Sequence, residues 1–146
     1  MGISMEELAA TPVSIVSERL DQLYAQAKGT FWDYLGCETL TAEPGHVVLK
    51  LDAGRHHLNA IGIVHGGVLS SLLDNAMGLA TMLARPDENT VTSNLNVNFV
   101  APLQAGELQV TAEIVHETRR SITCTGRVID AEGKLGSLAL ATFRVI

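Results

Sequence analysis

The feature that most constrains the fold is an almost uncharged run from Gly66 to Ala84, in which Asp74 is the one ionisable side chain. Its larger apolar residues recur at steps of three and four, the pattern of an amphipathic helix with one buried face. That face comprises Leu69, Leu72, Leu73, Ala76, Leu79, Ala80 and Leu83. The opposite stripe comprises Ser70, Asp74, Gly78 and Thr81. Because a solvated helix face normally carries Lys and Glu, we expect this second stripe to meet protein or a ligand cavity, with Asp74 on the cavity side.

The helix opens with Gly66 and Gly67. The first backbone N–H groups of a helix lack intrahelical partners and carry partial positive charge, and glycines allow a substrate oxygen to approach them closely. Asp74 lies about 12 Å further along the helix axis than Gly66, so one small carbonyl group cannot touch both within a single helix. If both act on the same carbonyl, Asp74 must come from a second copy of the chain, which predicts a two-fold dimer with shared sites.

A motif of the form NxxGxxHGG begins at Asn59 and is followed by Asp74. It resembles the signature of the hot-dog-fold acyl-CoA thioesterases of the phenylacetate-pathway (PaaI-like) group, and the likeness extends from about Leu58 to the C-terminus. The resemblance implies a hot-dog fold, in which an antiparallel sheet of about six strands wraps around one long central helix. It also implies hydrolysis of an acyl-CoA to free acid and coenzyme A by homodimers that often pair again.

Both groups on the helix fit thioester hydrolysis. The reaction needs a donor for the developing oxyanion, which the amide at Gly66 can supply, with Gly67 as a further substrate-binding residue. It also needs a base or nucleophile for the carbonyl carbon, which Asp74 can supply. A carboxylate is a weak base at neutral pH, so either burial strengthens Asp74 as a base or it attacks directly and forms an anhydride. The structural alternative for Asp74 is an ion pair with an arginine across an interface.

Three further residues take their expected roles from the family pattern. Asn59 would position the thioester or the attacking water, or it caps its own loop. His65 would hold the glycine turn in place, with general-base catalysis as the less favoured role. Thr92 matches the strand position at which related enzymes place a Ser or Thr near the catalytic acid, so we expect it to orient water; a threonine in an alternating strand is also common without any such role.

Arg119 and Arg120 form the one adjacent arginine pair in the sequence and fall in a predicted hairpin. They could bind the phosphates of coenzyme A through bidentate contacts, or belong to a solvated turn. The net charge of −6 and the scattered positions of the ten basic residues argue against a nucleic-acid-binding surface. We therefore expect a small-molecule acyl-CoA partner and no nucleic acid.

The length of 146 residues predicts one domain over residues 1–146, with residues 1–30 as an N-terminal helical extension. Cys37 and Cys124 have neither metal nor redox spacing, which fits a reducing compartment. The N-terminus lacks the basic-then-apolar pattern of a signal peptide, and polar residues interrupt the apolar run after Gly66. We therefore expect a cytoplasmic protein that does not enter a membrane.

Periodicity elsewhere places a helix from Thr11-Pro12 to Lys28-Gly29 and two strands, one within 31–41 and one at 47–52, joined by a turn at 43–46. Four strands follow the long helix: Thr90 to Val100, Leu108 to Ile114, Ile122 to Asp130 and Leu135 to Ile146. In the first of these, alternation puts Val91 on the apolar face and Thr92 on the neutral polar face. Segregated helices and meandering strands indicate an α+β domain with an antiparallel sheet.

Metal and cofactor chemistry have little support in the sequence. His56 and His57 are adjacent and cannot easily ligate one metal, and neither an HExxH motif nor a cysteine cluster is present. Two alternatives to a thioesterase are a non-catalytic acyl-CoA-binding module and an enoyl-CoA hydratase of the same fold. The retained acid favours an enzyme, and its place on the helix favours hydrolysis over hydration. The acyl group stays open between aryl and medium-chain.

Overall fold

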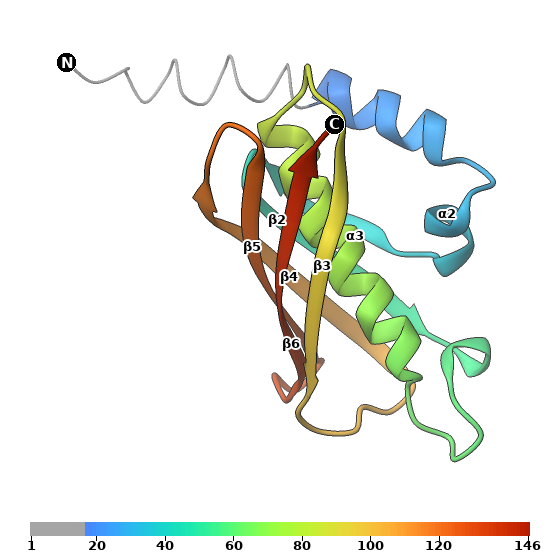
Figure 1. Cartoon of the computed structure of the whole chain (residues 1–146). Coiled ribbons are helices and arrows are strands. Elements are labelled where there is room, and N and C mark those ends of the chain that lie inside the picture. Colours follow the sequence, from blue (N-terminus) through green and yellow to red (C-terminus); the bar gives the residue numbers. More distant parts are fainter. Residues whose placement is uncertain (1–16) are drawn as a thin grey trace.

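The computed structural model describes residues 17–146, which form helices packed on a single sheet (Figure 1). Residues 17–27 are helical, and the expected cap at Thr11-Pro12 lies outside the described residues. The elements that follow are α2 (Phe31–Leu35), β1 (Glu38–Glu43), β2 (His46–Ala53), the 3-10 turn η1 (Arg55–His57), α3 (Gly66–Ala84), β3 (Thr90–Phe99), β4 (Gly106–Glu117), β5 (Ser121–Asp130) and β6 (Leu135–Val145).

The six strands make one sheet in the order β1-β2-β4-β5-β6-β3, and every neighbouring pair is antiparallel. The sheet curves around α3, which lies along its concave face (Figure 1). This arrangement confirms the predicted α+β hot-dog fold. It leaves β1 and β3 as the two edge strands, and β3 is the edge that follows α3 in the chain.

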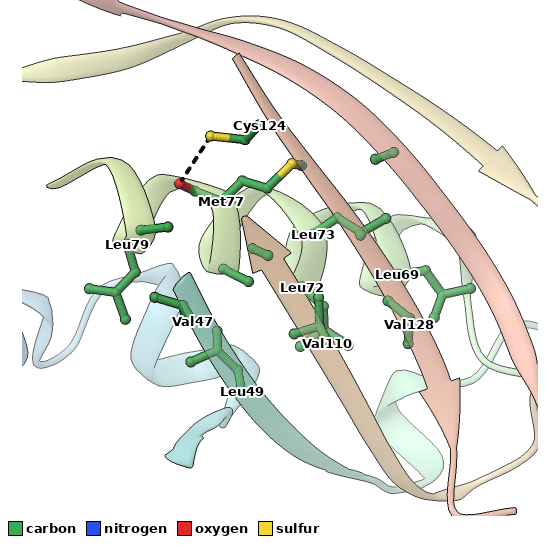
Figure 2. Close-up of a cluster of buried hydrophobic side chains, with 14 of the residues drawn as sticks. Val47, Leu49, Leu69, Leu72, Leu73, Met77, Leu79, Val110, Cys124 and Val128 are labelled. Atoms are coloured by element: carbon green, nitrogen blue, oxygen red, sulfur yellow. Dashed lines mark hydrogen bonds between the residues drawn. The ribbon is translucent and has the colours of Figure 1, made fainter. Parts of the chain in front are cut away.

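The core forms where α3 meets the sheet (Figure 2). The predicted apolar face of the helix is buried, and Leu72 and Leu73 have no exposed surface. Each fully buried leucine contributes about 1.5–3 kcal/mol through removal of apolar surface from water. The sheet supplies the opposite wall with inward-facing residues that include Val47, Leu49, Leu51, Val110, Cys124 and Val128.

Thr81 departs from the expectation that it belongs to the polar stripe. Its side chain is fully buried, and its hydroxyl donates to the backbone carbonyl of Met77 at 3.0 Å. Because the preceding turn of the helix accepts this hydrogen bond, and the hydroxyl also contacts the Cys124 sulfur at 3.4 Å, a threonine is tolerated in the core. The polar stripe is therefore shorter than predicted and ends before the last turn of α3.

By length and composition α3 could cross a membrane, since it has 19 residues and a mean hydropathy of 1.2. Half of this apolar segment is buried inside the protein. The sheet wrapped around α3 accounts for its apolar character, because a core helix of this kind satisfies the same criteria.

The expectation of a strand within 31–41 is wrong for its first half. Residues Phe31–Leu35 form the short helix α2, which ends at Gly36 in the left-handed conformation with φ of 86°. Glycine adopts that conformation without steric cost, and its N–H bonds the carbonyl of Trp32. A helix of one turn is too short to produce a clear helical period, so the apolar residues on both sides of Gly36 looked like one alternating strand.

Candidate active site

The N-terminus of α3 is held by the side chain of His65, which occupies the N-cap position with an extended backbone. Its Nδ1 accepts a hydrogen bond from the N–H of Gly67 at 2.8 Å, so this nitrogen is unprotonated. A methyl group at position 67 would lie 3.0 Å from the same Nδ1. The absence of a side chain at Gly67 therefore leaves space for the His65 imidazole to cap the helix.

The cap leaves one amide of the first turn available. The N–H of Gly67 bonds the His65 ring, and those of Val68 and Leu69 bond the His65 carbonyl at 2.9 and 3.2 Å. Within residues 17–146 the N–H of Gly66 has no acceptor. It lies at the positive end of a long helix, which makes it suited to bind the oxygen of a polarised carbonyl.

The ring of Phe99 lies against Gly66 and limits what this position can hold. A methyl group on Gly66 would approach the ring carbon Cε1 to 3.3 Å. Phe99 stands near the end of edge strand β3 and is 58% exposed. An aromatic ring therefore covers one side of the free amide. The sequence pattern identifies Phe99 only as an apolar residue of a strand.

Asp74 lies in the middle of α3 and is half-buried. Thr92 on β3 donates its hydroxyl to Oδ1 of Asp74 at 2.7 Å. A short hydrogen bond to a charged acceptor is strong and directional, so it fixes the orientation of the carboxylate. The second carboxylate oxygen has no protein donor among the described residues and can take a proton or attack a carbonyl carbon.

A β-bulge at Ser93 explains how Thr92 reaches the helix. Thr92 pairs with Phe143 on β6, whereas Asn94 pairs with the adjacent Thr142. Ser93 is therefore an extra residue in β3. Residues before the bulge are therefore on the opposite face from the one that simple alternation predicts. Thr92 points to the side of α3 and Val91 points outward with 44% exposure, so the sequence-based assignment of these two faces is wrong.

Asn59 acts as the cap of the loop that leads into α3. Its Oδ1 accepts hydrogen bonds from the N–H groups of Ile61 and Ile63 at 3.1 and 3.2 Å, and its own N–H bonds the carbonyl of Ile63 at 2.8 Å. The loop-cap alternative is therefore present in the structure. The side-chain NH₂ group has no acceptor among the described residues, so it can still donate to a ligand.

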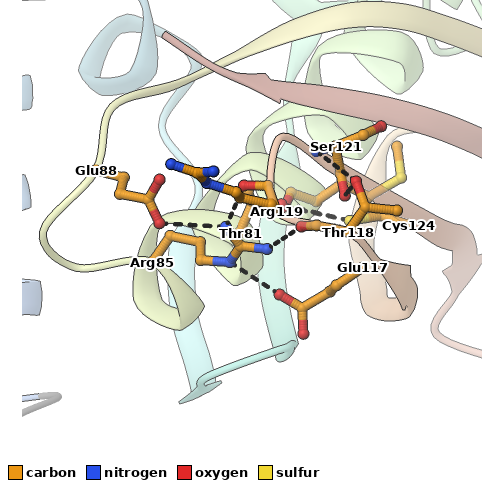
Figure 3. Close-up of polar contacts among 9 residues, drawn as sticks. Thr81, Arg85, Glu88, Glu117, Thr118, Arg119, Ser121 and Cys124 are labelled. Carbon is orange, nitrogen blue, oxygen red and sulfur yellow. Dashed lines mark hydrogen bonds and ion pairs between the residues drawn. The ribbon is translucent and has the colours of Figure 1, made fainter.

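The structure does not bring Arg119 and Arg120 to the glycine pair of the same chain. Both arginines lie in the turn between β4 and β5. Figure 3 shows how this turn is tied through Arg119 to Arg85, just after the end of α3. Gly66 is at the other end of this helix, about 27 Å away along its axis. Sequence reasoning does not identify Arg85, because a basic residue just before a proline is typical of any helix end.

A hollow of about 310 Å³ adjoins Gly67 on the side of α2. Its walls include Phe31, Tyr34, His56, His65 and Gly67. His57, which also lines the hollow, is 4% exposed, accepts from the Gly54 N–H at 3.0 Å and faces the Leu35 carbonyl at 2.9 Å. His57 is therefore occupied in joining η1 to α2. In residues 17–146 no group of three or more His, Cys, Asp or Glu could hold a metal.

The two thiols are poor nucleophiles at neutral pH. Burial raises the pKa of Cys37 and likewise the pKa of Cys124, and both are free cysteines. Asn75 donates weakly to the Cys37 sulfur at 3.8 Å, and Thr81 contacts the Cys124 sulfur at 3.4 Å. Covalent catalysis by a thiolate is disfavoured because the reactive form is scarce.

The sequence model of the thioesterase superfamily matches residues 61–137. The chain is 31% identical over 104 residues to human acyl-coenzyme A thioesterase 13, covering 69% of this chain and 74% of that protein. It is 29% identical over 112 residues to 1,4-dihydroxy-2-naphthoyl-CoA hydrolase of Listeria monocytogenes, covering 76% and 91%. A mutant of the phenylacetic acid degradation protein PaaI from Thermus thermophilus superposes with a TM-score of 0.74 at 32% identity, covering 80% and 98%.

The cap on α3 gives a prediction about stability. His65→Ala should lower the free energy of unfolding by about 0.5–2 kcal/mol, because the Gly67 amide loses its acceptor. His65→Asn should retain most of that stability, since asparagine is a good N-cap residue. Urea denaturation of the three proteins measures both effects. Equal losses in the two variants would show that the imidazole does more than cap the helix.

Proposed function

The chain belongs to the thioesterase superfamily and is a thioester hydrolase, and we propose that it cleaves an aryl- or medium-chain acyl-CoA to the free acid and coenzyme A. The observation that carries the proposal is the unbonded Gly66 amide at the positive end of α3, in a chain that also holds the oriented carboxylate of Asp74. The names of the human and Listeria relatives, both of which describe hydrolysis of CoA esters, support the substrate class. The hollow beside Gly67 offers room for an acyl group.

We infer that the working unit is a dimer in which β3 pairs with its own copy. This strand has 10 residues, lies at the sheet edge and keeps Leu95 and Val97 half-exposed beside the more exposed Phe99. A long edge strand without charged residues is a ready template for another strand. Two-fold antiparallel pairing centred on the middle of β3 sets the start of one strand beside the end of the other.

This pairing would complete a shared site. Thr92, near the start of β3, holds Asp74, whereas Phe99, at its end, lies against Gly66. Pairing start to end therefore brings Asp74 of one chain towards Gly66 of the partner subunit. The same pairing resolves the separation of about 12 Å between the two groups within a single helix.

In the proposed reaction the carbonyl oxygen of the thioester accepts a hydrogen bond from the Gly66 amide. Preorganised donors of this kind typically stabilise an oxyanion by about 3–4 kcal/mol. Asp74 of the other chain, oriented by Thr92, either takes a proton from the attacking water or attacks the carbonyl carbon itself to form an anhydride. In either route the carbon–sulfur bond breaks, the thiol of coenzyme A leaves with a proton, and water supplies the second oxygen of the acid. Neither route calls for a metal or cofactor.

Other residues would support this chemistry without taking part in bond changes. The free NH₂ group of Asn59 is placed to donate to the thioester or the water, and His65 keeps the glycine turn closed. Arg119 and Arg120 belong to the chain that supplies Asp74 and lie in the β4–β5 turn beside the end of α3, which is about 15 Å from Asp74 along the helix axis. An extended pantetheine arm could join these two regions, so this arginine pair would bind the phosphates of coenzyme A.

Replacing the carboxylate tests the chemistry directly. Asp74→Asn should lower kcat by about 10²–10⁴-fold, because the amide can neither take a proton nor attack. Asp87→Asn, which removes an exposed acid beyond the end of α3, is the matched control and should leave the rate unchanged. Release of coenzyme A from a panel of acyl-CoAs, followed with a thiol reagent, measures both. If the wild-type protein binds acyl-CoA but releases no coenzyme A from any substrate of the panel, it is a binding module instead.

Removing the Gly66 amide hydrogen tests the oxyanion donor. Proline suits the first position of a helix, and His65 already has the extended backbone (ψ 136°) preferred before proline, so Gly66→Pro should leave α3 intact. Gly66→Ala adds the same methyl-sized contact with Phe99 and retains the N–H. We expect kcat of Gly66→Pro to fall about 10²–10³-fold below that of Gly66→Ala. Equal kcat values in the two variants would remove the amide from the mechanism.

A further inference from the structure

Arg85 joins the end of α3 to the turn between β4 and β5 (Figure 3). Its side chain is only 16% exposed, and each of its three guanidinium nitrogens donates a hydrogen bond. Nε donates to Glu117 at 3.0 Å, Nη2 to the Thr118 carbonyl at 2.6 Å, and Nη1 to both Glu88 and the Arg119 carbonyl at 3.2 and 3.1 Å. The guanidinium therefore holds the backbone of the turn as well as two carboxylates.

The arginine pair itself is held only through its backbone. The Arg119 carbonyl accepts from Arg85, and the Arg120 carbonyl accepts from the N–H of Val145 at 2.9 Å. Neither the Arg119 nor the Arg120 guanidinium has an acceptor among residues 17–146. A fixed backbone that carries two unengaged guanidinium groups is pre-organised for an anion, because less conformational freedom is lost on binding.

Charge at this end of the molecule depends on Arg85. The chain has a net charge of −6, yet Arg144, which pairs with Ser121 across β5 and β6, adds a further basic residue beside the turn. Glu88 and Glu117 lie in the same region and would repel an anion. Arg85 pairs with both glutamates. Its removal would leave two unpaired carboxylates next to the arginine pair and would also release the backbone of the turn.

We propose that Arg85 is a positioning residue for the phosphate groups of the CoA ester, acting by fixing the β4–β5 turn so that Arg119 and Arg120 can bind them. The inference rests on the proposed function. It assigns no contact between Arg85 and the substrate, because the guanidinium is already occupied within the protein. Lysine cannot replace it, since one ammonium group cannot donate along the three directions that the planar fork serves.

A double-mutant cycle tests this role. The variants are Arg85→Gln, the pair Arg119→Ala/Arg120→Ala, and all three changes together, each assayed on an acyl-CoA and on the N-acetylcysteamine ester of the same acid, which lacks the phosphates. Arg85→Gln should raise KM for acyl-CoA about five- to tenfold with kcat unchanged, and should change KM less than about twofold when the pair is already alanine. The short ester should show no change in KM in any variant.

Two controls keep the result specific. Arg127→Gln, which removes a positive charge from an exposed position on β5, should leave both KM values unchanged. Arg85→Lys retains the charge and should raise KM for acyl-CoA as Arg85→Gln does. If Arg85→Gln does not fold, Arg85→Lys carries the cycle in its place.

The inference is overturned if Arg85→Gln raises KM by the same factor with and without the arginine pair, or if the short ester is affected equally. Either result would assign Arg85 to general stability. Wild-type protein that hydrolyses neither ester would instead contradict the proposed function. Normal hydrolysis with an additive cycle would contradict only the role of Arg85.

Discussion

The proposed chemistry depends on one backbone group, the N–H of Gly66 at the start of α3, which has no acceptor within residues 17–146. A helix must leave its first amides without intrahelical partners, and His65 satisfies the amide of Gly67 while leaving its neighbour free. Burial of the opposite helix face against the curved sheet fixes this amide in space. The same packing that stabilises the core therefore pre-organises a donor at the positive end of the helix dipole.

A second local irregularity, the bulge at Ser93, sets the orientation of the Asp74 carboxylate. One extra residue in β3 brings Thr92 to the side of Asp74, where its hydroxyl fixes one carboxylate oxygen. Amide and carboxylate then occupy different turns of one rigid helix, so neither can move to meet the other. In our account a complete site requires two chains, and the uncharged edge strand β3, which borders both groups, is the surface through which they would join.

Much of this architecture could be predicted from the sequence because it follows from periodicity. The bounds of α3, the turns between later strands and the buried face around Leu72 all follow from residue spacing. The bulge could not be predicted, because Val91 and Ser93 are compatible with either face of an edge strand. Thr81 is buried because its hydroxyl bonds the helix, and Arg85 bonds residues over thirty positions away. Polar contacts between distant residues, and hydrogen bonds from a side chain to its own helix, do not produce a periodic pattern in the sequence.

Hybrid dimers test the central claim most directly. Chains carrying Asp74→Asn and chains carrying Gly66→Pro are each expected to be inactive, and a tagged heterodimer of the two would contain one site with both groups intact and one site with neither. Sites shared between subunits predict that the purified heterodimer recovers about half of the wild-type rate of coenzyme A release. A heterodimer of verified composition that is no more active than its parent variants would contradict the account, because each chain would then have to supply both groups to its own site.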